Sequence, residues 1–171
     1  MTDDVQQIVA DIEHQERELQ FDSFDEDDAW RLGCLITDMA RARRLPVAVD
    51  ILRNGHQLFH AALPGATADN DAWIHRKAAT VNRFAASSLL VALRMESSGT
   101  ALDESFGVDP LEYAAAGGSF PLRIRRVGVV GAITVSGLPQ LEDHALVVEA
   151  IQAFLVGDAS DGGVGVGIAS D

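Results

Sequence analysis

The sequence of 171 residues has a single cysteine, few basic residues and no long apolar run. Cys34 cannot form a disulfide within the chain, and its position between Leu32 and Ile36 predicts a buried thiol on a helix in a reducing compartment. No apolar stretch approaches the roughly 18 residues of a membrane-spanning helix, and the acidic start differs from a signal peptide. We therefore expect a cytoplasmic protein without a membrane partner.

Basic side chains are scarce, with 13 Lys and Arg residues compared with 26 Asp and Glu residues, and Lys77 is the only lysine. The formal net charge of −13 repels nucleic acid and anionic membranes. The sequence also lacks an internal repeat, a Walker loop, a dinucleotide fingerprint, a metalloprotease motif and a nucleophile elbow. It predicts no nucleic-acid partner and no metal site, and it leaves open whether the protein is an enzyme.

Apolar residues make up 47% of the chain, which is enough for one domain with its own core. We expect this domain over residues 1–156 and a disordered tail rich in Gly and Asp over residues 157–171. Helical spacing of apolar residues and capping signals predict four helices. These run from Val5 to Leu19, from Ser23 to Arg44, from Asp69 or Asn70 to about Ser97, and from Pro139 to Leu155.

Two β-hairpins are predicted. Residues 47–52 and 56–63 flank Asn54-Gly55, the strongest short hairpin signal, and residues 120–124 and 127–135 flank Arg125-Arg126. Residues 19–21 are candidates for a short edge strand. A two-residue loop in the first hairpin pairs Val49 with His60, which places His60 among aliphatic side chains. His60 is then either a buried, hydrogen-bonded histidine or a haem or metal ligand.

The third helix carries candidate binding residues. If it is continuous, Arg76, Arg83 and Ser87 fall on one polar stripe, beside Trp73 and Lys77. Aligned guanidinium groups suit a carboxylate or phosphate ligand, or acidic groups of a neighbouring subunit. The long connection over residues 97–118 contains one expected helical turn ending at Tyr113, and it ends at Gly117-Gly118, where backbone N–H groups can face a ligand.

Three blocks of the sequence resemble a known family. The blocks LFHAALPGATADNDAWIHRK, GGSFP and VGAITVSGLPQLEDH are similar to the uncharacterised branch of the HbpS-like proteins, often labelled "haem-degrading domain". The resemblance implies a three-layer α/β sandwich with a central, mostly antiparallel sheet of about five strands, like that of profilin. It also implies a symmetric homo-oligomer and a relation to haem binders.

The resemblance carries over to particular positions. The residues that match and that we predict to bind a ligand are Asn70, Trp73, Arg76, Lys77, Arg83, Ser87, Gly117, Gly118, Asp143 and His144. Ala116 departs from the family, which commonly has a histidine immediately before the diglycine. Haem degradation that depends on that histidine is therefore not expected here.

Two main hypotheses follow. The first is a homo-oligomer that binds a small anionic ligand, including haem, for which His60, His144 and Tyr113 are the available axial ligands. The second is an assembly or adaptor protein in which the same residues form subunit contacts. A third, weaker hypothesis is an acid–base enzyme that uses Asp143 and His144 from different subunits.

Overall fold

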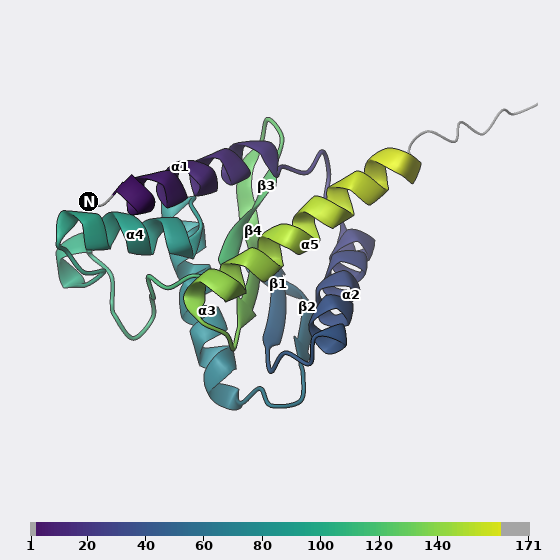
Figure 1. Cartoon of the computed structure of the whole chain (residues 1–171), viewed down its shortest axis with the longest axis horizontal. Coiled ribbons are helices and arrows are strands. Elements are labelled where there is room, and N and C mark those ends of the chain that lie inside the picture. Colours follow the sequence, from purple (N-terminus) through teal and green to yellow (C-terminus); the bar gives the residue numbers. More distant parts are fainter. Residues whose placement is uncertain (1–2, 162–171) are drawn as a thin grey trace, which may run out of the picture.

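The computed structural model describes residues 3–161, which form an α/β/α sandwich (Figure 1). The elements are α1 (Asp3–Glu18), α2 (Glu26–Ala42), β1 (Ala48–Arg53), β2 (His56–Ala62), α3 (Ala68–Phe84), α4 (Ser88–Ser98), the 3₁₀ turn η1 (Glu104–Phe106), β3 (Ser119–Ile124), β4 (Gly128–Ser136) and α5 (Gln140–Asp161). No helix within these residues is long and apolar enough to span a bilayer. The helix α5 continues through residues 157–161 of the expected tail, and residues 162–171 lie outside the described part.

The sheet has the strand order β2-β1-β4-β3, and all neighbouring strands are antiparallel. Both predicted hairpins are confirmed. The count within residues 3–161 is four strands, not about five, because the expected edge strand is reduced to a single parallel bridge between Phe21 and Ile124.

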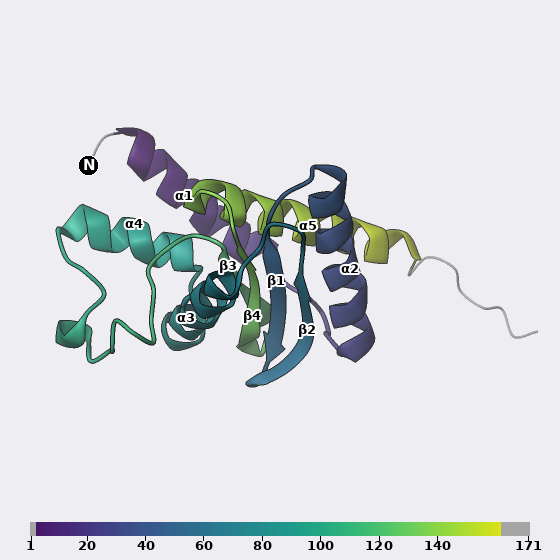
Figure 2. The same cartoon turned by 90° about the horizontal axis from the view of Figure 1, so that it is seen from below.

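Helices cover both faces of the sheet (Figures 1 and 2). The main core lies between the sheet and α2 with α5, and it includes Leu32, Ile51 and Ile133. On the other face α3 packs against the central strands through Ala78 and Val81. The helices α1 and α4 pack against each other through a second apolar cluster beside α3.

The expected continuous third helix is wrong, because it breaks into α3 and α4 at Ala85. Ala85 adopts the left-handed conformation with φ of 51°, which a non-glycine residue rarely adopts. Ser87 then begins α4 as its N-cap and accepts a hydrogen bond from the Leu90 N–H. Arg76 and Ser87 therefore belong to two different helices.

Two expected helix starts are also corrected. The N-cap of α2 is Asp25, which exchanges hydrogen bonds with Asp28, so Ser23 is not the cap. The N-cap of α3 is Thr67, whose N–H donates to the side chain of Asn70. Asn70 thus contributes to the start of the helix from its third position.

The predicted register of the first hairpin is wrong beyond Leu52. A β-bulge between Ile51 and Leu52 pairs Ile51 with Phe59 and Asp50 with His60. Because one inserted residue reverses the face of every later side chain, His60 lies beside Asp50 and not among aliphatic residues.

Candidate functional site

A cavity of about 300 Å³ lies where the first half of α3 meets the glycine turn before β3 and the turn from β4 into α5. We call it the Lys77 cavity. Five of the ten predicted binding residues line it: Asn70, Trp73, Lys77, Gly117 and Asp143. The other lining residues are Asp69, Ala116, Ser136, Gly137, Leu138 and Gln140.

A buried ion pair joins two sides of this cavity. Lys77 Nζ lies 3.0 Å from Asp143 Oδ2 and donates to the Val135 carbonyl at 3.2 Å. The side chains of Lys77 and Asp143 are 4% and 2% exposed. Asp143, in the first turn of α5, also accepts the N–H groups of Leu138 and Gly137. The pair therefore ties α3 to the turn between β4 and α5.

Burial moves the two pKa values of this pair toward each other. It lowers the pKa of Lys77, and the charge of Asp143 opposes that shift only in part. It raises the pKa of Asp143 in spite of the nearby ammonium group and the two backbone donors. Transfer of the proton from the ammonium group to the carboxylate is thus easier here than in water.

Gly117 and Gly118 lie so close to neighbouring groups that neither position has room for a side chain. Gly118 has φ of 124°, and a Cβ there would lie 2.4 Å from the Val135 carbonyl oxygen and 2.7 Å from Lys77 Nζ. A Cβ on Gly117 would lie 2.2 Å from the Gln140 carbonyl oxygen. The Gly117 N–H donates to the Gln140 side chain, so it is already used within the chain.

Trp73 and Arg76 of α3 contact each other beside the Lys77 cavity. The Trp73 indole N–H donates to Asp69 at 3.2 Å, and the Arg76 guanidinium lies 4.1 Å from the centre of the Trp73 ring. Trp73 lines the cavity, whereas Arg76 does not.

The remaining predicted residues lie elsewhere. Arg83 donates to the Phe106 carbonyl, and its guanidinium is 5.9 Å from the ring of Tyr113. Ser87 is buried at the start of α4, and Gly118 packs behind Lys77 without lining the cavity. The structure therefore does not bring Arg76, Arg83 and Ser87 onto one surface.

His144 is buried in the interior. Its Nε2 lies 2.9 Å from Gln15 Oε1, and its Nδ1 has no hydrogen-bond partner. Burial lowers the pKa of His144 from 6.5 to about 4. Although it follows Asp143 in the chain, it packs beside Phe120 and does not line the Lys77 cavity.

A smaller cavity of about 220 Å³ contains His60. The carboxylate of Asp50 accepts hydrogen bonds from Gln57 and, at 3.2 Å, from His60 Nδ1, while His60 Nε2 lies 3.4 Å from Asp71. Asp50 is 2% exposed, and burial raises its pKa. Asp50, an acidic residue inside an apolar strand, is the sequence signal that could have indicated this cluster. Its pairing with His60 depends on the β-bulge, which the sequence does not indicate.

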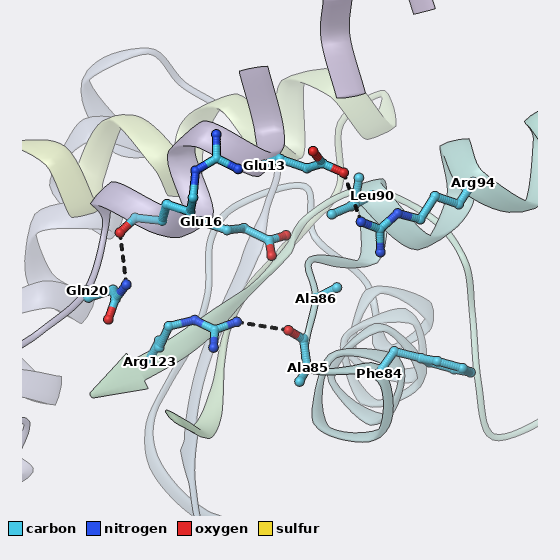
Figure 3. A pocket seen from close by; sticks show the side chains of 10 residues that line it. Glu13, Glu16, Gln20, Phe84, Ala85, Ala86, Leu90, Arg94 and Arg123 are labelled. Atoms are coloured by element: carbon cyan, nitrogen blue, oxygen red, sulfur yellow. Dashed lines mark hydrogen bonds and ion pairs between the residues drawn. The ribbon is translucent and has the colours of Figure 1, made fainter. Parts of the chain in front are cut away.

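A third cavity, of about 410 Å³, lies between α1, the break between α3 and α4, and β3 (Figure 3). Its lining includes Arg17, Arg94 and Arg123. Arg123 donates to the Ala85 carbonyl at 3.0 Å, and Arg94 pairs with Glu13 at 2.9 Å. Sequence reasoning missed this arginine cavity because its residues come from three distant segments with no shared motif.

No group of three or more His, Cys, Asp or Glu side chains that could hold a metal ion occurs within residues 3–161. The residues that line the Lys77 cavity carry an amine, carboxylates, a hydroxyl group, amides and an indole ring.

The sequence and the fold can be compared with known proteins. The family model described as "Haem degrading protein HbpS-like" matches residues 24–152, and the chain belongs to this family. It is 58% identical over 147 residues to a UPF0303 protein of Streptomyces coelicolor, covering 86% of this chain and 93% of that one. A UPF0303 protein of Edwardsiella ictaluri is 47% identical over 150 residues, covering 88% and 96%.

Solved structures share the fold. The crystal structure of the Ybr137w protein has a TM-score of 0.80 at 34% identity, covering 88% of this chain and 89% of that one. The PduOC:heme complex has a TM-score of 0.64 at 21% identity, covering 77% and 94%. HbpS itself has a TM-score of 0.62 at 20% identity, covering 80% and 92%. The last two similarities concern the fold alone.

Proposed function

We propose that this protein binds a small organic molecule with an anionic group in the Lys77 cavity. The observation that carries the proposal is the position of Lys77, the only lysine, buried in the wall of a cavity to which three segments of the chain contribute. A buried charge is costly unless its contacts satisfy it, so a site that keeps one beside a cavity is a candidate for function.

The lining suits a small ligand. Two of the three N–H bonds of Lys77 are used by Asp143 and Val135, which leaves one for a ligand oxygen. Ser136 also lines the cavity, and Trp73 contributes a large aromatic side chain to its lining. A volume of about 300 Å³ is at the lower end of the usual range for small-molecule sites.

Within one chain, residues 3–161 do not fit a buried haem. The lining of the Lys77 cavity contains no His, Cys, Met or Tyr to bind iron, and Ala116 stands where the family commonly has a histidine. His144 is buried against Gln15, and Tyr113 lies beside Arg83. His60 does line a cavity, but Asp50 and Asp71 flank it and would repel the haem propionates.

Calorimetric titration with small carboxylates tests the proposal, with Ala116→Phe as the variant that fills the cavity. We expect saturable binding to the wild type and loss of at least about tenfold in affinity in Ala116→Phe, since the new ring occupies the ligand's space. Ala101→Phe, the same change at an exposed position outside the cavity, is the matched control. Equal affinity in all three proteins would contradict the proposal.

A haemin titration followed by absorbance tests the haem hypothesis separately. We expect weak binding without saturation that is equal in the wild type, His60→Ala and His144→Ala. Stoichiometric binding that one of these variants abolishes would overturn our interpretation and would identify the iron ligand.

An assembly role is the second candidate, favoured by Arg76 and Arg83. Neither guanidinium forms an ion pair within residues 3–161, although acidic residues are in twofold excess in the sequence. In a homo-oligomer they would pair with acidic groups of another copy. Light scattering tests this idea, because such ion pairs are screened and the oligomer would dissociate as salt rises. Salt-independent mass, unchanged in Arg76→Ala and Arg83→Ala, would exclude it.

A further inference from the structure

Lys77 has the surroundings of a reactive amine. Its Nζ is fixed on one side by Asp143 and on another by the Val135 carbonyl, and the backbone of Gly118 packs where a larger residue would overlap it. Its side chain is 4% exposed, yet it contributes to the wall of a cavity. The amine is therefore held in one place, shielded from bulk water and beside a space for a small molecule.

Asp143 supplies the proton acceptor that such an amine needs. A lysine amine attacks a carbonyl carbon only in its neutral form, and enzymes obtain that form by burying the lysine. The carboxylate lies 3.0 Å from Nζ, within reach of direct proton transfer, and burial moves the two pKa values toward each other. A pair that only tied α3 to α5 would not need to line a cavity.

We propose that Lys77 forms an imine with a small aldehyde or 2-oxo acid that enters the Lys77 cavity. This inference rests on the proposed function, since it assigns a carbonyl group to the ligand bound there. An oxo acid combines the anionic group with an electrophilic carbon, so that both features are recognised within one cavity of about 300 Å³.

The reaction balances with the groups present. The ammonium proton of Lys77 passes to Asp143, and the free electron pair of Nζ then forms a bond to the carbonyl carbon. The carbonyl oxygen takes the proton from Asp143 to give a carbinolamine. Asp143 then takes a second proton, from the nitrogen of the carbinolamine, and gives it to the hydroxyl oxygen. The C–O bond breaks, water leaves, and a C=N bond remains. One water is released, and no oxidant or reductant is needed.

The chain contains its own internal control. Because Lys77 is the only lysine, the α-amino group of the chain is the only other primary amine. With ordinary pKa values of about 10.4 and about 7.9, the α-amino group is neutral a few hundred times more often than a lysine at pH 7. An unfolded chain should therefore react at its α-amino group, whereas the folded protein should react at Lys77.

The experiment treats the full-length protein at pH 7 with glyoxylate and cyanoborohydride, which reduces an imine to a stable secondary amine. Peptide mapping by mass spectrometry then measures the carboxymethyl adduct at each amine. We expect about a tenfold excess at Lys77 over the α-amino group in the folded protein, and the reverse order in urea. An excess at the α-amino group in both conditions would overturn the proposal.

Variants separate this inference from the proposed function. Lys77→Arg keeps a charge for Asp143 but removes the reactive amine, and Ala116→Phe closes the cavity while keeping Lys77. We expect loss of the adduct in both, with the α-amino reaction unchanged. If glyoxylate binds the wild type in calorimetry and Ala116→Phe weakens it, but no adduct forms at Lys77, the imine is excluded and the binding function stands. If glyoxylate and every other small carboxylate tested fail to bind and no adduct forms, both the imine and the proposed binding function are contradicted.

Discussion

Glu16 of α1 accepts a hydrogen bond from the backbone N–H of Ser87, 71 residues further along the chain, at 2.7 Å. Glu16 is 9% exposed, and its carboxylate lies at the N-terminus of α4 (Figure 3), where a negative charge is favoured by the helix dipole. The contact fixes α1 to the break that Ala85 makes between α3 and α4. It thus stabilises the departure from a continuous helix.

Removing the Glu16 carboxylate should destabilise the protein measurably. Glu16→Gln keeps an acceptor oxygen but loses the charge, so we expect a loss of about 1 kcal/mol, whereas Glu16→Ala leaves the Ser87 N–H buried and should cost about 2–3 kcal/mol. Urea unfolding measures both. Glu13→Ala, which removes a partly exposed partner of Arg94, is the control and should cost less than about 1 kcal/mol. Equal losses at positions 13 and 16 would contradict the assigned role.

Breaking the pair between Lys77 and Asp143 should cost far more than breaking a surface pair. Lys77→Met or Asp143→Asn leaves the other member buried without its partner, and we expect each to lose about 3 kcal/mol. The double variant should lose less than the sum, with a coupling energy of about 1–3 kcal/mol in urea unfolding.

The pair between Arg43 and Glu149 is the control for that cycle, because its side chains are 47% and 48% exposed. Its coupling energy should be much smaller than that of the buried pair, because solvent screens exposed charges. Additive losses for Lys77 and Asp143 would mean that the buried pair contributes no more than a surface contact.

Burial of His144 should lower the free energy of unfolding as the pH falls. Its pKa is about 4 in the folded protein and about 6.5 in the unfolded chain, so the unfolded chain binds the proton first. The free energy of unfolding that depends on His144 is highest above pH 6.5, decreases as the pH falls toward 4 and stays constant below pH 4. The loss between these two limits is on the order of 3 kcal/mol.

Urea unfolding at pH 7, 5.5 and 4.5 tests this dependence in the wild type and in His144→Gln. Asp50 and Asp143 have raised pKa values and therefore favour the folded state as pH falls, which opposes the trend of His144. The difference between the two proteins isolates the histidine. A difference that does not change with pH would show that His144 is not buried in its neutral form.

Local signals in the sequence were sufficient for the two hairpins. Asn54 with φ of 51° and Gly55 with φ of 76° form the turn that their residue types predict, and Arg126 adopts φ of 66° at the second turn. Local signals did not predict that a new helix begins at Ser87. A serine at a polar helix position and a serine that begins a new helix look alike in sequence, and the contact that decides between them comes from Glu16 in α1.

Half of the ten predicted binding residues line the Lys77 cavity, and their arrangement could not be predicted from the sequence. Lys77 and Asp143 both belonged to the predicted set, yet their pairing across 66 residues depends on how α3 and α5 pack on the sheet. The partner of His60 was missed because a single bulged residue reversed the face of its strand. Residue type and spacing predict which functional groups one helix or strand carries. Which of these groups share a cavity depends on the contacts between helices and strands.

Gly118→Ala should separate two reasons for a glycine at the turn before β3. A positive φ alone costs a non-glycine residue about 1–3 kcal/mol, which is the loss we expect for Gly128→Ala, since Gly128 has φ of 112°, close to the 124° of Gly118, and open space around it. A Cβ on Gly118 would also overlap the Val135 carbonyl oxygen and Lys77 Nζ. We therefore expect Gly118→Ala to lose at least about 3 kcal/mol in urea unfolding and to weaken carboxylate binding in calorimetry, because the ammonium group must move. If Gly118→Ala and Gly128→Ala cost the same, backbone conformation alone explains the glycine, and the close packing behind Lys77 does not hold the amine in place.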